Sequence, residues 1–169
     1  PHSASAVLAN LMLQDKGVRP VPLVTTVHGT DTELVGLEPA YRLAVEFRTG
    51  DWLIGDTLAA TLGFLRRHEI ALVCVDEPQG LKTSVPPVTA ATSPVAMVRF
   101  HGRNTETWEK RGGEAADRFK YLYDRKELEE WAEKVKELSA VTEKVHIIFK
   151  NKYEDYSVQN AREFLELLA

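Results

Sequence analysis

The stretch VAMVRFHGRN at residues 95–104 is an apolar strand that ends in basic side chains. Side chains of a β-strand alternate between two faces, so Arg99, His101 and Arg103 are expected on one face. Two guanidinium groups and an imidazole on one face can hold a phosphate or a carboxylate. The alternative is that both arginines pair with acidic residues in a structural network. The stretch therefore predicts either an anion site or an ion-pair network at the end of a strand.

Strands and helices alternate on both sides of this stretch. Apolar runs predict strands at residues 21–27, 43–48, 71–76, 95–101 and 144–150. Helical periodicity predicts helices at residues 4–14, 56–67, 126–138 and 157–168, with Asp56 as a cap of the second. This alternation is typical of a parallel α/β sheet, whose carboxyl-terminal edge binds ligands. With 169 residues the chain is too short for a closed eight-stranded barrel, which needs about 200.

Composition excludes few function classes. The net charge of −4 gives no bulk attraction to nucleic acid or to an anionic membrane. No apolar run approaches the roughly 20 residues of a membrane helix, so we expect no membrane association. Cys74 is the single cysteine, which fits a reducing compartment and predicts a cytoplasmic protein. The chain opens on Pro1 rather than methionine, so we expect a preceding segment.

Acidic residues follow two other predicted strands. Glu46 and Arg48 leave their strand on the same face, so Glu46 is a candidate general base or the internal partner of an arginine. Asp76 and Glu77 point to opposite faces, and only one of them can reach the site. Mixed carboxylate and imidazole ligands would suit a metal, but no HxH or HExxH spacing is present, and we predict no metal site. The sequence names no cofactor.

Asparagines complete the candidate set. Asn104 closes the opening stretch, and Asn151 follows the last predicted strand, where it could bind a ligand or close an Asx turn. We take His101 and Glu46 as the candidate catalytic residues. The candidate ligand-binding residues are Arg48, Glu77, Arg99, Arg103, Asn104 and Asn151.

Residues 41–168 resemble the YecE-like family, a group of bacterial and archaeal proteins of unknown function. The matching motifs are AVEFR at 44–48, VDEP at 75–78, RFHGRN at 99–104, YLY at 121–123 and FKN at 149–151. The family's usual Phe-Asn-Asn is here Phe149-Lys150-Asn151. The resemblance implies a (β/α) barrel of the TIM type, of which this chain would supply the last four strands.

Residues 1–40 resemble a different family. The runs HGTD at 28–31 and LVG at 34–36 are similar to the bacillithiol-pathway enzyme N-acetylglucosaminyl L-malate synthase, a glycosyltransferase. The nucleotide-sugar half of such an enzyme is absent, so the chain is not expected to act as a glycosyltransferase. We expect a chimera of two domains, 1–40 and 41–169, with a boundary near residues 38–41.

The expected fold is α/β: a parallel half barrel of four βα units with one extra N-terminal helix–strand unit. Strand 21–27 should pair beside strand 43–48. Open sheet edges predict a homo-oligomer. Three functions stay open at this point. They are an enzyme or enzyme fragment acting on a phosphorylated small molecule or nucleic acid, a non-catalytic binding module for an anion, and a chimeric or truncated scaffold without activity.

Overall fold

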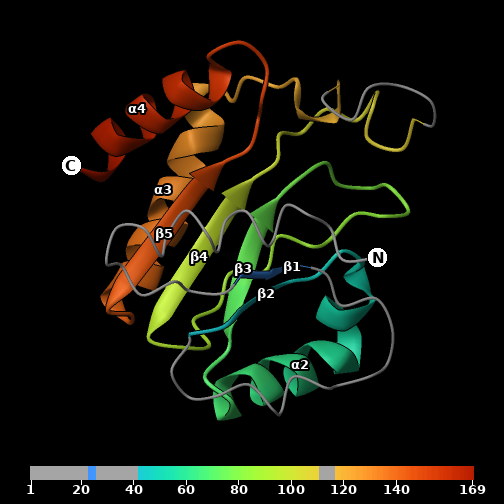
Figure 1. Cartoon of the computed structure of the whole chain (residues 1–169), viewed down its shortest axis with the longest axis vertical. Coiled ribbons are helices and arrows are strands. Elements are labelled where there is room, and N and C mark those ends of the chain that lie inside the picture. Colours follow the sequence, from blue (N-terminus) through green and yellow to red (C-terminus); the bar gives the residue numbers. More distant parts are fainter. Residues whose placement is uncertain (1–22, 26–41, 111–116) are drawn as a thin grey trace.

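The computed structural model describes residues 23–25, 42–110 and 117–169. Its centre is a five-stranded sheet with the strands in chain order, and every neighbouring pair is parallel (Figure 1). The strands are β1 (Leu23–Thr25), β2 (Ala44–Glu46), β3 (Ala71–Asp76), β4 (Val95–Phe100) and β5 (Lys144–Phe149). The α/β class and the parallel sheet expected from the sequence are confirmed.

The first strand joins the sheet where it was expected. Leu23 of β1 lies opposite Ala44 of β2, and Thr25 lies opposite Glu46. The predicted pairing of strand 21–27 with strand 43–48 is therefore confirmed. The predicted helix at residues 4–14 lies outside the described residues.

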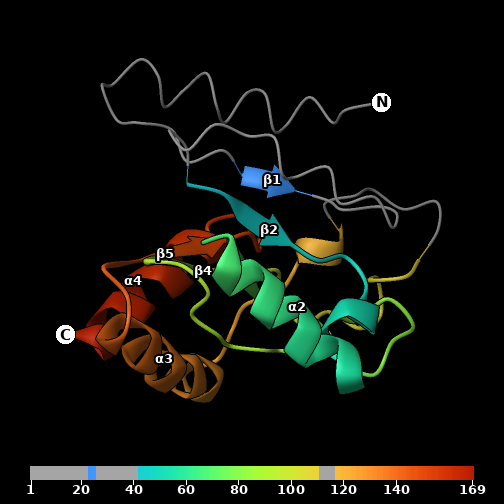
Figure 2. The ribbon, with the colours of Figure 1, turned by 90° about the horizontal axis from the view of Figure 1, so that it is seen from below.

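Three helices cover one face of the sheet. They are α2 (Gly55–Arg67), α3 (Arg125–Ala140) and α4 (Tyr156–Leu168), and Figure 2 shows all three on the same side. We call this side of the sheet the helix face and the opposite side the far face. Short 3-10 helices at Gly50–Leu53 and Asp117–Phe119 lie in the loops that follow β2 and β4.

Helix α3 illustrates how the sequence builds the core. Asp124 caps the helix through a reciprocal capping box with Glu127, in which each side chain bonds the other's backbone N–H. The apolar stripe of the helix is buried, and Trp131 is fully buried against the ring of Phe100 on β4. The helix predicted at residues 126–138 is confirmed, and it begins one residue earlier, at Arg125. This packing fixes the helix face of β4.

Strand register assigns each residue of the edge to a face. Asp76, Phe100 and Phe149 lie side by side, and the two rings stack on the helix face. Alternation then puts Val75, Arg99 and Ile148, which are also side by side, on the far face.

Two local expectations need correction. Ile54, not Asp56, is the N-cap of α2, and its side chain makes no capping bond; Asp56 lies inside the first turn. The strand predicted at residues 43–48 is shorter in the structure, where β2 covers only Ala44–Glu46. No helix in the described part of the chain combines the length and apolar character that a membrane crossing requires.

Candidate functional site

Glu46 is the centre of a buried charged cluster on the far face. Its carboxylate is 2 % exposed at the end of β2. Arg48 donates to Oε1 at 2.8 Å, and Arg99 from β4 donates to Oε2. His101 brings its Nε2 to 3.4 Å from Oε1. We call the group formed by Glu46, Arg48, Glu77, Arg99, His101 and Lys150 the Glu46 cluster.

The environment of Glu46 keeps it ionised. Burial alone would raise its pKa, but the contact with His101 and the charges of Arg99 and Arg48 outweigh burial and hold the pKa at about 2. Both oxygens are also occupied by arginine donors. Such a carboxylate is a weak base, so its chemistry is that of a positioning group.

His101 is fully buried and poorly satisfied. Neither imidazole nitrogen makes a hydrogen bond to the described residues, although Nε2 lies near Glu46. The rings of Trp108 and Phe119 flank it at centroid distances of 6.2 and 6.1 Å. Burial lowers the pKa of His101 more than the contact with Glu46 raises it. A neutral imidazole can both donate and accept a proton.

Glu77 joins the cluster from the end of β3. Its Oε1 accepts a hydrogen bond of 2.7 Å from the backbone N–H of Val85 in the long loop that follows. Burial raises the pKa of Glu77 to about 7, and the positive charge of Arg48 only partly offsets this effect. Glu77 therefore takes up a proton at a much higher pH than an exposed glutamate does. Of the adjacent pair, Glu77 faces the cluster and Asp76 does not.

Lys150 completes the cluster and was absent from the sequence-based candidates. Its backbone N–H donates to the carbonyl of Phe100 at 2.8 Å, which extends the β4–β5 ladder by one residue. Alternation from Ile148 puts the side chain on the far face, beside the charges of Arg99 and Glu46. The same alternation could have identified Lys150 from the sequence, because the predicted strand 144–150 ends on it.

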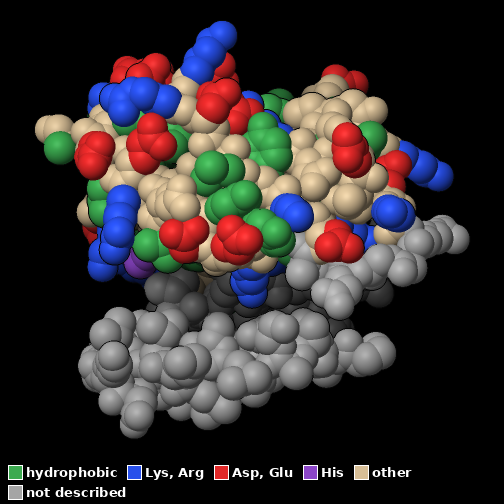
Figure 3. All heavy atoms as spheres, turned by 90° about the horizontal axis from the view of Figure 1, so that it is seen from above, with side chains coloured by type: hydrophobic (Ala, Val, Ile, Leu, Met, Phe, Trp, Pro, Cys, Tyr) green, Lys and Arg blue, Asp and Glu red, His purple; other side chains and the backbone are tan. Residues whose placement is uncertain are grey.

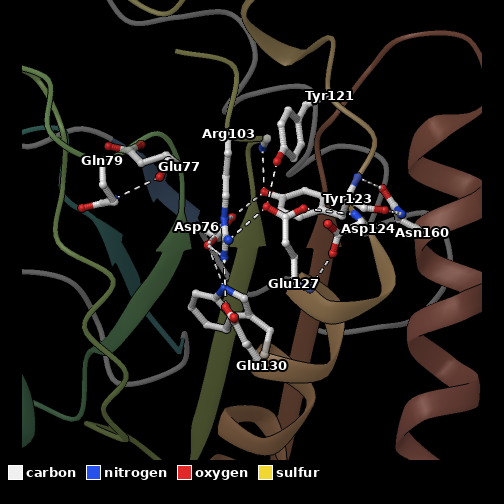
Figure 4. Close-up of polar contacts among 12 residues, drawn as sticks. Asp76, Glu77, Gln79, Arg103, Tyr121, Tyr123, Asp124, Glu127, Glu130 and Asn160 are labelled. Carbon is white, nitrogen blue, oxygen red and sulfur yellow. Dashed lines mark hydrogen bonds and ion pairs between the residues drawn. The ribbon is translucent and has the colours of Figure 1, made fainter.

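Arg103 does not share a face with Arg99 and His101, which corrects the sequence prediction. It pairs with Asp76 on the helix side, with its Nε 2.9 Å from Oδ2 and its Nη2 2.8 Å from Oδ1. Its Nη1 also contacts Glu127 at 3.0 Å, so that Arg103 lies between the two carboxylates (Figure 4). The network alternative, in which an arginine pairs with Asp76, describes Arg103 correctly.

Gly102 is the reason for this reversal. Its φ of +88° breaks the strand alternation just before Arg103, and a Cβ there would lie 2.7 Å from Cβ of Tyr121. Tyr123 further fixes the turn, since its hydroxyl accepts from Gly102 N at 2.8 Å and donates to Asp76 at 2.7 Å. Glycine is needed at this position because it allows the positive φ of the turn and leaves room for the side chain of Tyr121.

The two candidate asparagines make structural hydrogen bonds. Asn104 donates to the carbonyl of Lys120 at 3.1 Å, and it is exposed in the loop after β4. Asn151 donates to the carbonyl of Tyr121 and to the side chain of Asn160, at 2.9 and 2.8 Å. Asn104 therefore connects two loop segments, and Asn151 connects the end of β5 to the loop at Tyr121 and to α4.

The cluster carries a surplus of positive charge near pH 7. Three cations, Arg48, Arg99 and Lys150, face two carboxyl groups, Glu46 and Glu77, and the pKa of Glu77 is raised. Among residues 23–25, 42–110 and 117–169, no group of three or more His, Cys, Asp or Glu side chains is arranged to hold a metal ion.

These features define an α/β protein with a charged cluster at the carboxyl-terminal edge of a parallel sheet. The chain belongs to the family described as "Protein of unknown function DUF72", whose model matches residues 26–169. The YecE-like assignment made from the sequence is thereby confirmed.

Individual relatives agree with this assignment. The chain is 37% identical over 130 residues to the UPF0759 protein YunF of Bacillus subtilis strain 168, covering 74% of this chain and 46% of YunF. A DUF72 family protein of Thermotoga maritima matches with 37% identity and a TM-score of 0.67, covering 76% of this chain and 47% of the other. One from Enterococcus faecalis V583 matches with 27% identity and a TM-score of 0.81, covering 93% and 61%. The chain thus spans about half the length of YunF and of the Thermotoga protein.

The comparisons give no support to a glycosyltransferase resemblance of residues 1–40. The family match begins at residue 26, inside that segment. The Enterococcus match covers 93% of the chain, more than residues 41–169 alone could supply. The family assignment therefore reaches across the expected boundary at residues 38–41.

Proposed function

We propose that the Glu46 cluster binds a small anionic ligand that carries a phosphate or carboxylate group. The observation that carries the proposal is a set of buried polar atoms without partners. In the described part of the chain, the atoms of this kind are Nε of Arg99, both nitrogens of His101 and Oδ1 of Asn151. Buried polar groups in proteins are nearly always paired, so such a concentration at Arg99 and His101 favours a missing ligand.

The charge balance supports an anion. Glu46 accepts hydrogen bonds from Nη1 of Arg99 and from Nη1 of Arg48. Each guanidinium group keeps further N–H donors that a ligand could use. A phosphate or carboxylate could accept from these donors while Lys150 adds a third positive charge. Protonation of Glu77 near neutral pH reduces the repulsion that an incoming anion meets.

His101 is one residue of this cluster that could move a proton. Its imidazole is neutral at pH 7 because burial lowers its pKa, and its partner Glu46 is ionised. We assign His101 the role of proton donor or acceptor toward a bound ligand. Glu46 is assigned a positioning role for Arg48, Arg99 and His101, in place of the catalytic role expected from the sequence.

A small molecule fits better than a nucleic acid. Figure 3 shows the face toward which the strands point, and on its coloured part Lys and Arg side chains are interspersed with Asp and Glu. Nucleic-acid surfaces instead carry extended basic patches. Arg99 is also largely buried, with 12% of its side chain exposed, which suits a ligand small enough to enter the cluster.

The experiment is calorimetric titration with inorganic phosphate, a sugar phosphate and a single-stranded oligonucleotide. The proposal predicts binding of both phosphates and a loss of that binding in Arg48→Gln. Lys152→Gln is the matched control, because Lys152 is an exposed cation two residues after Lys150. Equal phosphate binding by wild type and Arg48→Gln would contradict the proposal. Preference for the oligonucleotide would shift it to nucleic acid.

We further propose that the five strands form part of a (β/α) barrel and that the open edge of this sheet associates with a second copy of this chain. Within the described residues, β5 pairs with β4 alone, and Ile148 on its far face is 37% exposed. An open edge with an exposed apolar side chain favours association.

Light scattering tests this assembly. The proposal predicts a dimer for the wild-type chain and a shift toward monomer in Ile148→Lys, which adds a charge to the exposed far face of β5. Val141→Lys is the matched control, because Val141 is exposed at the C-terminal cap of α3, away from that face. A monomeric wild-type chain at micromolar concentration would overturn the assembly proposal without touching the anion site.

A further inference from the structure

Lys150 differs from the other cations of the cluster in having no carboxylate partner. Glu46 gives its two oxygens to Arg48 and Arg99. No ion pair of Lys150 occurs among the described residues, although the side chain is half-buried. Its ammonium instead lies 4.4 Å from the ring centre of Phe119, the ring that also flanks His101. The amine thus lies against the ring of Phe119 and close to the charges of Arg99 and Arg48.

Burial and the neighbouring cations favour the uncharged amine, and they outweigh the attraction of the Phe119 ring for the ammonium. Burial and the positive charge of Arg99 lower the pKa of Lys150 to about 8, despite the opposing effect of Glu46. The other charged groups that act on it are Arg48 and Lys152. An uncharged lysine amine in a half-buried site is a nucleophile toward carbonyl carbons.

We propose that Lys150 forms an imine with small carbonyl compounds that also carry a phosphate or carboxylate group. This inference rests on the proposed anion site, which would bind the charged end of the compound at Arg48 and Arg99. The nitrogen of Lys150 attacks the carbonyl carbon, a C–N bond forms, and the carbonyl oxygen takes up a proton. Loss of one water then gives the imine, with His101 positioned on the same face to carry protons.

The positions of the side chains support these separate roles for the arginines, His101 and Lys150. Arg99, His101 and Lys150 all lie on the far face at the ends of the neighbouring strands β4 and β5. Neighbouring strands are about 4.8 Å apart, a spacing that a compound of a few carbon atoms can bridge. Cations at one end and an amine at the other would therefore select a short compound with an anionic group and a carbonyl group.

Reductive trapping tests the inference. Pyridoxal 5′-phosphate is the probe, and borohydride reduces the imine to a stable secondary amine that peptide mass mapping locates. At pH 7.5 we expect Lys150 to carry at least about tenfold more label than Lys152, because a pKa lowered from 10.5 to about 8 leaves far more free amine on Lys150. Pyridoxal without the phosphate should label Lys150 less. Even labelling of all lysines would overturn the inference.

Two variants separate this inference from the anion site. Lys150→Arg keeps the charge and removes the nucleophile, so it should still bind inorganic phosphate but lose the dominant adduct. Lys152→Gln should retain both. Phosphate binding without a Lys150 adduct would overturn the imine alone, whereas no phosphate binding by the wild type would overturn the anion site. A Lys150 adduct formed equally well with pyridoxal would overturn the requirement for an anionic group.

Discussion

Two buried carboxylates lie one strand apart at the same edge of the sheet, and their surroundings differ. Asp76 on the helix side receives Arg103, Tyr123 and Trp131, all at hydrogen-bond distances. Glu46 on the far face receives Arg48 and Arg99 but only a long contact from His101. We call the group formed by Asp76, Arg103, Tyr123, Glu127 and Trp131 the Asp76 cluster.

The difference teaches how to separate a structural network from a candidate site. Around Asp76, the donors and acceptors match, and Trp131 and Tyr123 connect the strand edge to the helix layer. Around Glu46, buried nitrogens of Arg99 and His101 are left without partners. A matched network stabilises the fold, whereas an unmatched one with surplus charge favours ligand binding.

Removing the centre of the matched network should have the largest effect on stability. Asp76→Ala removes the main partner of Arg103. It also leaves the buried hydroxyl of Tyr123 and the indole N–H of Trp131 without an acceptor. We expect a loss of about 3–5 kcal/mol in the free energy of unfolding, measured with urea. Glu130→Gln is the control, because Glu130 only approaches Arg103 at 4.0 Å and is half exposed. A loss below about 1 kcal/mol for Asp76→Ala would remove the contrast between the two clusters.

Glu46 should make stability depend on acid pH. Its folded pKa of about 2 lies below the unfolded value near 4.5, so its contribution is present above pH 4.5 and is lost as pH falls toward 2. The shift corresponds to about 3 kcal/mol. Glu46→Gln should therefore be less stable than wild type at pH 7 and nearly equal at pH 2. Urea unfolding across this range measures the difference, and a gap that persists at pH 2 would contradict the account.

Glu77 should act with the opposite sign. Its folded pKa of about 7 lies above the unfolded value, so its carboxyl favours folding below about pH 4.5 and disfavours it as pH rises through 7. Glu77→Gln, whose amide oxygen can still accept from Val85, should stabilise the chain by about 1–3 kcal/mol at pH 8. The gain should vanish at pH 4.5. Thermal unfolding at the two pH values checks this, and a destabilised variant at pH 8 would contradict it.

Charge pairs outside both clusters should matter least. Arg125 and Glu129 form an exposed pair at 3.0 Å on α3. Exposed pairs contribute about 0.5 kcal/mol or less, so Arg125→Gln should leave the urea midpoint almost unchanged. A larger change would mean that surface charge, rather than burial, controls stability in this chain.

Much of the fold could be predicted because its signals are local. Apolar runs indicated the strands, and helical periodicity indicated the helix at residues 126–138, although the Asp124–Glu127 capping box that begins α3 was not recognised. Alternation correctly put Glu46, Arg48, Arg99 and His101 together, which is the part of the site that strand geometry alone determines.

The errors arose where alternation stops. The positive φ of Gly102 sends Arg103 to the opposite side, and that backbone state depends on the approach of Tyr121, a residue nineteen positions later. Asn151 looked like a ligand group, but its partner Asn160 comes from a different element, α4. Long-range packing of this kind leaves no signal at the residue itself.

Phosphate affinity of Arg99→Gln and Arg103→Gln, measured side by side by calorimetry, tests the central claim most directly. The account predicts that Arg99→Gln weakens phosphate binding by at least about tenfold, because a hydrogen bond to a charged group contributes about 1.5–3 kcal/mol. Arg103→Gln should lower the free energy of unfolding and leave the affinity within about twofold. Equal affinity in wild type and Arg99→Gln, or a greater loss in Arg103→Gln, would contradict the assignment of the anion site to the Glu46 cluster.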